Sequence, residues 1–103
     1  DKNHELIVAE LSGNIVGTLH LTFLPSISYQ GGLRSQVESV RVDSKLRSQG
    51  IGAKMMQYAI VRAKERGAYL MQLTSHETRI NAHRFYEKLG FKKAHVGMKL
   101  ILK

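Results

Sequence analysis

The sequence predicts an α/β fold, an α+β sandwich whose mixed, mostly antiparallel sheet contains a central βαβ unit. Two β-rich runs, Leu6 to Leu11 and Ile15 to Leu24, flank the turn-forming Ser12-Gly13-Asn14, which predicts a hairpin. The apolar period then changes to a helical one over Gly50 to Arg66, and a further apolar run follows at Ala68 to Thr74. Strand, helix and strand in this order predict a βαβ unit, which is normally right-handed.

The helix of this unit is predicted from a four-residue repeat of apolar side chains. Ile51, Met55, Ala59 and Ala63 form one stripe along it. Gly67 then fits the left-handed backbone position at which many helices end.

Before the helix, the residues from Pro25 to Gly32 predict a loop, because they include Pro, Ser and a Gly pair. Val37 to Val42 alternates and predicts a third strand. Regular alternation would place Val40 and Val42 on the same face as Glu38.

After the helix, Ala68 to Thr74 is apolar at both alternations, which predicts a strand buried on both faces in a parallel pair. A second helix is predicted over about Asn81 to Leu89, with Gly90 at its end. Phe91 to Ala94 and Val96 to Leu102 are predicted to complete the sheet as two strands.

Length and composition favour one globular domain over residues 1–103. The chain has 43% hydrophobic and 23% charged residues, close to globular averages. It has no Cys, which excludes a disulfide scaffold, a cysteine nucleophile and a thiolate metal site, and no spacing of His, Asp and Glu predicts a metal site. No apolar run is long enough for a membrane span, and the first residues lack the apolar core of a signal peptide, so we expect a cytoplasmic protein.

The charge balance favours an anionic partner. Sixteen Lys and Arg against eight Asp and Glu give a formal charge of +8. Nucleic acid, an anionic surface and a polyphosphate cofactor would all suit that charge. The basic residues are scattered rather than gathered in a tail, which disfavours nucleic acid.

A candidate phosphate loop precedes the first helix. The segment Arg47 to Gly52 reads RSQGIG, and its two glycines leave room for an anion at the amides of a helix start. A Walker loop would require GxxxxGK[ST], and a dinucleotide fingerprint would require Gly where Met55 stands. Taken alone, the hexapeptide fits a glycine-containing helix start equally well.

Three segments together resemble the GCN5-related N-acetyltransferase (GNAT) family. RSQGIG matches the family's [RQ]-x-x-G-x-[GA] loop, and Glu38 to Val42 is similar to its E-x-L-x-V strand, five residues ahead of Arg47. Asn81 to Phe91 resembles the A-x-x-F-Y-x-x-x-G-F segment of its last main helix. The resemblance covers about Leu6 to Leu102, without the strand and two helices that usually begin the domain, so we expect an N-terminally incomplete domain.

The resemblance implies acetyl-CoA as the acetyl donor, no metal, and direct attack by an amine in a ternary complex. It implies that an extended pantetheine arm pairs with a strand backbone and that Arg47 and the following helix start bind the pyrophosphate. Lys45, Arg79 or Lys88 could serve its other phosphates. The implied cofactor-binding residues are Val40, Arg41, Val42, Arg47, Ser48, Gln49, Gly50, Ile51, Gly52, Ala53, Asn81, Phe85 and Tyr86.

Two residues are the implied catalytic pair. Tyr86 stands where many relatives carry the acid that protonates the CoA thiolate, although it could simply pack beside Phe85. Glu38 is the implied general base, directly or through a water, although it could simply pair with a nearby Arg or Lys. His76, just beyond the carboxyl end of a predicted parallel strand, is the reserve candidate for the base or for substrate contact. Relatives usually have Asn seven residues before the Tyr, where this chain has Arg79, so the pantetheine contact of that Asn is in question.

The acceptor is expected to be the primary amine of a small molecule. The run Arg79 to Tyr86 is similar to relatives that acetylate small amines such as aminoalkylphosphonates. The alternatives are acetylation of a protein N-terminus or lysine, and an acyl-CoA-binding module without turnover. The resemblance implies a dimer in many relatives, and the edge of a strand over Val96 to Leu102 could pair with a second copy, so a homodimer is one of the states that the sequence allows.

Overall fold

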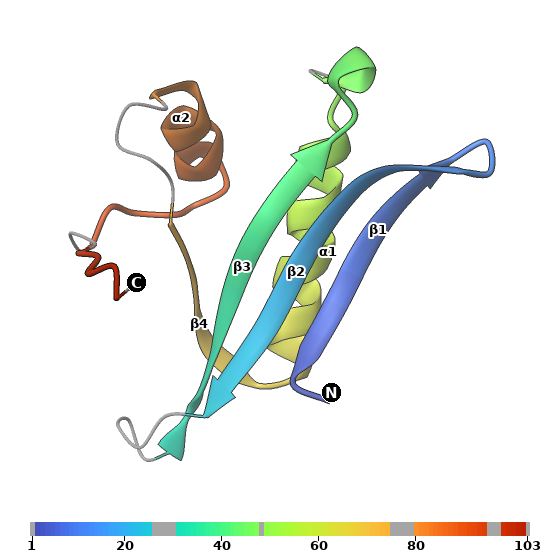
Figure 1. Cartoon of the computed structure of the whole chain (residues 1–103). Helices are drawn as coiled ribbons and strands as arrows, with labels where there is room; N and C mark the ends of the chain where they lie inside the picture. The colour runs from blue at the N-terminus through green and yellow to red at the C-terminus, as the bar shows by residue number, and fades with distance from the viewer. Residues whose placement is uncertain (1, 26–30, 48, 75–79, 95–97, 103) are drawn as a thin grey trace. The chain divides into compact units, whose positions relative to one another are not determined.

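The computed structural model describes residues 2–25, 31–47, 49–74, 80–94 and 98–102. The chain forms two compact units, Asp1–Leu73 and Thr74–Lys103, each of which is considered by itself (Figure 1). No helix in the described ranges is long and apolar enough to cross a membrane.

The first unit is built on a sheet with the strand order β1-β2-β3-β4. Strands β1 (His4–Leu11), β2 (Asn14–Pro25) and β3 (Leu33–Val42) pair antiparallel, and β4 (Ala68–Leu73) pairs parallel with β3. This arrangement confirms the predicted mixed sheet with a βαβ unit, together with the hairpin. Ser12 and Gly13 both have positive φ, 52° and 82°, as a two-residue hairpin turn of right-handed twist requires.

A single long helix covers one face of this sheet (Figure 1). Helix α1 (Ile51–Glu65) follows a short 3₁₀ turn, η2 (Ser44–Leu46), and contacts all four strands. The predicted stripe is confirmed, because Met55, Ala59 and Ala63 are buried against the sheet together with Met56. The strands contribute Ile7, Leu19, Leu21, Phe23 and Val37 to the same core. Gly67, at φ 79°, ends the helix as predicted, and its N–H donates to the Lys64 carbonyl.

A glycine on β2 and a buried serine on β3 shape the packing of the first unit. A Cβ on Gly17 would lie 2.9 Å from Met55 Cε and 3.3 Å from the Arg41 carbonyl oxygen, so the absence of a side chain lets the helix approach β2. The fully buried hydroxyl of Ser35 donates to the Leu70 carbonyl at 2.8 Å, which satisfies it within the core.

The prediction that Ala68 to Thr74 is buried on both faces is wrong. None of the residues of β4 is fully buried, and Tyr69 and Leu70 are each 38% exposed. The physical reason is position, because β4 is the last strand in the order of the sheet and pairs only with β3 within the described residues. An apolar run predicts the parallel pairing but not how many neighbours the strand has.

The second unit contains α2 (Ile80–Lys88), close to the predicted helix. The strands predicted at Phe91 to Ala94 and Val96 to Leu102 are not found, because residues 91–94 and 98–102 are described without strand structure. Residues 95–97 lie outside the described ranges. Apolar composition makes a strand only where a partner supplies the hydrogen bonds of a ladder, and no ladder partner is described for these residues.

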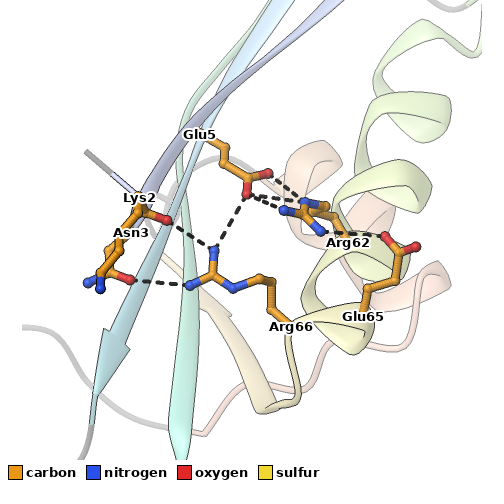
Figure 2. A network of polar contacts seen from close by, with 6 residues as sticks. All are labelled: Lys2, Asn3, Glu5, Arg62, Glu65 and Arg66. Atoms are coloured by element: carbon orange, nitrogen blue, oxygen red, sulfur yellow. Dashed lines mark hydrogen bonds and ion pairs between the residues drawn. The ribbon is translucent and has the colours of Figure 1, made fainter.

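An ionic network ties β1 to the C-terminal half of α1 (Figure 2). The Glu5 carboxylate accepts hydrogen bonds from Arg62 Nε at 2.9 and 3.1 Å, and Arg66 Nη1 lies 3.6 Å from it. Arg66 also donates to the Lys2 carbonyl at 3.1 Å and lies over the Phe23 ring, 4.2 Å from its centroid. These contacts connect the edge strand, the helix and the core.

The hydrogen bond with Glu5 raises the pKa of the Arg62 guanidinium. Because the folded-state pKa is the higher one, the stability that depends on the Arg62 charge is present below the unfolded-state pKa of arginine and would be lost only as the pH rises through the folded-state pKa. Arginine stays charged across the working pH range, so the titration of Arg62 does not change stability there.

We expect Glu5→Gln to lower the melting temperature by several degrees, because it leaves two arginines without their shared carboxylate. The matched control is Glu65→Gln, because Glu65 is 62% exposed and lies 3.8 Å from Arg62, so its removal should change stability little. Circular dichroism melts of both variants at neutral pH measure the difference. Equal melting temperatures would show that the network of Figure 2 does not hold β1 to α1.

Candidate functional site

Strand β3 contains an extra residue near its C-terminal end. Thr18 faces Arg41 and His20 faces Glu38, so two steps along β2 correspond to three along β3. Ser39, within this stretch, has φ 55°, a value uncommon for residues other than glycine. The irregularity is a β-bulge, a feature that bends a strand and redirects its side chains.

The bulge corrects the prediction that Val40 and Val42 share a face with Glu38. Val42 faces Gly17, on the side of the sheet that packs on α1, whereas Glu38 faces His20 on the opposite side. The extra residue shifts the alternation by one, so the valine and the glutamate lie on different faces. Glu38 is thereby exposed and available to a ligand on the face away from α1.

The ladder between β3 and β4 stops where the bulge begins. The last pair is Val37 with Leu73, and for the rest of its length β3 is paired only with β2 in the described part of the chain. The backbone from Val40 to Val42 therefore has one edge not used in the sheet. An extended ligand can add to such an edge by main-chain hydrogen bonds, as a short β-strand would.

This strand end leads directly to the predicted phosphate loop. The Asp43 N–H donates to the Val16 carbonyl at 2.8 Å, and its side chain accepts from the Lys45 N–H at 3.0 Å, which sets the turn of η2. Arg47 follows η2 and is exposed, as is Gln49. Ser48 lies outside the described residues.

Helix α1 begins without a side-chain cap. Gly50 is its N-cap residue, in the left-handed conformation at φ 81°, and it makes no side-chain cap hydrogen bond. The first intrahelical bond of this end is from the Lys54 N–H to the Gly50 carbonyl at 3.0 Å. The amides of Ile51, Gly52 and Ala53 precede that bond, and such amides with the helix dipole form a site for an anion.

Glu38 is held by neighbouring amides. Gln36 Nε2 donates to Glu38 Oε1, and Gln72 Nε2 donates to Gln36 Oε1 at 2.9 Å. The alternative that Glu38 pairs with Arg or Lys therefore has no support among the described contacts, where its partner is an amide. Sequence reasoning missed both glutamines; alternation places Gln36 beside Glu38, but the register of Gln72 could not be read from the sequence.

In the second unit, Tyr86 is placed by the end of α2. The Phe91 N–H donates to the Tyr86 carbonyl at 3.1 Å and the Gly90 N–H to the Glu87 carbonyl at 3.0 Å, with Gly90 at φ 102°. This is the Schellman arrangement, and the rings of Tyr86 and Phe91 form its hydrophobic contact, with centroids 5.9 Å apart. The Phe85 ring lies 5.1 Å from Tyr86.

Besides Ser48, three of the residues named from the sequence have no described side chain. His76 and Arg79 lie outside the described residues, and Asn81 lies in α2 with only its backbone described. Within the described ranges, no group of three or more His, Cys, Asp or Glu could hold a metal ion.

A comparison of the sequence with protein families identifies the family of this chain. The sequence model described as "Acetyltransferase (GNAT) family" matches residues 1–91. The chain belongs to the GNAT acetyltransferase family. Enzymes with the GNAT fold use acetyl-CoA, and the resemblance stated from three short segments is confirmed.

Two characterised GNAT relatives are N-acetyltransferases by name. Aminoalkylphosphonate N-acetyltransferase of Salmonella typhimurium is 32% identical over 98 residues, which cover 92% of this chain and 61% of the relative. Glucosamine 6-phosphate N-acetyltransferase of Trypanosoma brucei brucei is 32% identical over 91 residues, covering 88% of this chain and 60% of the relative. The chain thus spans about three fifths of the length of these relatives.

Solved GNAT-like structures superimpose closely on this chain. A protein from Bacillus halodurans C-125, described as a transcriptional regulator, has a TM-score of 0.94 and 52% identity, covering 99% of this chain and 68% of its own. Glucosamine-6-phosphate N-acetyltransferase from Arabidopsis thaliana has a TM-score of 0.83 and 27% identity, covering 98% and 68%. The predicted fold class is therefore confirmed.

The start of α1 generates a test with a matched control. Gly50 and Gly13 have φ values of 81° and 82°, and a Cβ at either would meet no atom within 4 Å. Gly50→Ala and Gly13→Ala should each cost about 1 kcal/mol of folding free energy from backbone strain. Only Gly50→Ala should also reduce the stabilisation by acetyl-CoA, because it distorts the helix start.

Thermal melts with and without acetyl-CoA measure both effects. A ligand at 100 times its Kd should add roughly 2.7 kcal/mol to the stability of the wild-type chain. An unchanged acetyl-CoA shift in Gly50→Ala would show that this helix start does not bind the cofactor.

Proposed function

We propose that this chain is the acetyl-CoA-binding part of an N-acetyltransferase that acetylates a primary amine of a small molecule by direct attack in a ternary complex. The observation that carries the proposal is the end of β3, where a strand edge at Val40 to Val42, unpaired among the described residues, leads into the uncapped start of α1. This combination suits a ligand with an extended amide arm and a pyrophosphate. Membership of the GNAT family supports the same donor.

Different residues of the chain bind different parts of acetyl-CoA. Acetyl-CoA, when bound, supplies the activated thioester. The backbone of Val40 to Val42 binds the pantetheine amides and orients the acetyl carbonyl, and Arg47 with the amides of Ile51, Gly52 and Ala53 binds the pyrophosphate. The remaining contacts come from Arg41, Ser48, Gln49, Gly50, Asn81 and Phe85.

Glu38 is the proton acceptor of the reaction and Tyr86 is its proton donor. Glu38 accepts a proton from the ammonium group, directly or through one water, because only the neutral amine has the lone pair needed for attack. Tyr86 donates its phenolic proton to the departing CoA thiolate, for which a phenol that is neutral at pH 7 is suited. The Gln36 amide stabilises the Glu38 carboxylate in the position from which it acts.

The acceptor is an amine that also carries a phosphate or phosphonate group. The two relatives are named for an aminoalkylphosphonate and for glucosamine 6-phosphate, and both compounds combine an amine with a phosphorus oxyanion. The formal charge of +8 favours such a substrate, and Arg34 and Arg41 lie on the same face of the sheet as Glu38. A guanidinium binds phosphate oxygens with paired hydrogen bonds.

A second candidate is an acyl-CoA-binding module without turnover. It is favoured by the 52% identity to a protein described as a transcriptional regulator.

The proposal for location and partners is a cytoplasmic protein without a membrane or nucleic-acid partner. The homodimer stays a prediction, without support from a strand edge at the described residues 98–102, which form no strand.

A panel of amines tests the acceptor. Thiol release from acetyl-CoA should be at least about tenfold more efficient in kcat/KM with an aminoalkylphosphonate or glucosamine 6-phosphate than with ethanolamine or glucosamine, because the oxyanion adds specific contacts. A peptide with a free N-terminus and a peptide that contains lysine test the alternative that the substrate is a protein. Turnover of peptides alone would overturn the small-molecule proposal, and cofactor binding without any turnover would favour the binding module.

Tyr86→Phe should lower kcat about 100-fold with little change in the KM for acetyl-CoA, because it removes only the proton donor. The matched control is Tyr58→Phe, since Tyr58 is 59% exposed on α1 and has no assigned role. Steady-state rates across pH measure both variants. Wild-type kcat in Tyr86→Phe at every pH would assign Tyr86 to packing beside Phe85 and Phe91.

A further inference from the structure

A polar row crosses the sheet on the face opposite α1. His4 pairs with Thr22, Thr22 with Gln36, and Gln36 with Gln72, so one residue of each strand lies in register. Two residues farther along each strand, and on the same face, His20 of β2 is the direct partner of Glu38 on β3. Cross-strand partners on one face have Cβ atoms about 5 Å apart, so the His20 and Glu38 side chains are immediate neighbours.

Two of these side chains form an imidazole pair. His4 Nε2 and His20 Nδ1 lie 2.9 Å apart, and the rings are 5.1 Å apart between centroids with a 51° tilt. His4 Nδ1 lies 3.1 Å from Thr22 Oγ1. His4 is exposed, whereas His20 is half-buried between β1 and β3. The pair therefore extends from the neighbour of Glu38 to the solvent.

The short N···N distance requires one proton between the two rings. In one tautomeric arrangement His4 Nε2 carries it and His20 Nε2 carries the other N–H. In the second arrangement His20 Nδ1 donates to His4 Nε2, His4 Nδ1–H donates to Thr22 Oγ1, and His20 Nε2 has an open lone pair. The pair can then take up a proton at His20 and release one at His4, which leaves it in the first arrangement. Rotation of the rings, or exchange of their protons with water, restores the second arrangement before the next turnover.

We propose that His20 and His4 form a proton relay that carries the proton of the acceptor amine from Glu38 to the solvent. The relay rests on the proposed function, in which Glu38 is the base. Glu38 passes the proton to His20 Nε2, directly or through one water, the Nδ1–H of His20 moves to His4 Nε2, and His4 releases its Nδ1–H to water. Strand pairing places two charged residues beside this path, Glu38 and Arg41 on β3.

The proton count of the reaction leaves one proton to be carried away from the site. An ammonium loses one proton to become the attacking amine and a second after the C–N bond forms and the C–S bond breaks. One of these protons balances the one that the CoA thiolate acquires from Tyr86, and the other is released for each turnover. Because Gln36 holds Glu38 with an amide that donates, Glu38 needs a separate acceptor to become a base again. His20 is the titratable residue opposite it.

The relay is tested by His20→Asn and His4→Gln and by the double variant. Each single variant should lower kcat about 10-fold or more at low buffer concentration, with the KM for acetyl-CoA unchanged. The double variant should lose no more than the worse single one, since the two rings act in series. Added imidazole buffer should restore much of the loss, which a purely structural defect would not show. The control is His83→Gln on α2, which removes a histidine outside this row.

Wild-type kcat in His20→Asn at every buffer concentration, or a loss that imidazole does not restore, would overturn the relay. The proposed function is judged separately, by turnover of the wild-type chain on the amine panel. If the wild type makes no product, nitrogen-15 NMR spectra of the histidine rings test the interaction of His4 and His20 independently of activity. The His20 resonances should change in His4→Gln and in Glu38→Gln, and rings that respond to neither change would overturn the relay without any activity.

Discussion

The extra residue in β3 at Ser39 is the constraint on which the candidate site depends. It reverses the alternation, so Glu38 faces the open side of the sheet while Val42 remains on the side of α1. The ladder with β4 ends at Val37 and Leu73, just before the bulge. One irregularity therefore coincides with both an exposed carboxylate and a strand edge available to an extended ligand.

The position of α1 determines whether its first amides can serve the same ligand. Gly17 lets Met55 approach β2, and Glu5 binds both Arg62 and Arg66 at the other end of the helix. Arg66 lies on the Phe23 ring, so the ionic network is continuous with the core. With the helix held along its length, Gly50 and the amides after it are fixed just beyond the end of β3.

The two faces of the sheet differ in their side chains and in their roles. The face toward α1 is apolar and carries stability, through residues such as Leu19, Leu21 and Phe23. The opposite face carries two hydrogen-bonded groups, the amides of Gln72 and Gln36 with the Glu38 carboxylate, and the imidazole pair of His4 and His20. Hydrogen bonds between side chains of neighbouring strands orient these groups, which is what acid and base chemistry requires of a site.

Local features were determined by the sequence itself. Ser12-Gly13, the Met55, Ala59 and Ala63 stripe, and the terminating Gly67 depend on backbone sterics and on side chains a few residues apart, so they could be predicted. The order of the three motifs was likewise sufficient to predict the GNAT family.

The remaining features depend on partners far away in the chain, so no local pattern predicts them. The register that opposes His20 to Glu38, the bulge that separates Glu38 from Val42, and the contact of His4 with His20 all arise from strand pairing. The exposure of β4 and the absence of strand structure at residues 91–94 and 98–102 have the same origin. A ladder forms only where two segments meet, and no single segment of sequence states which other segment that is.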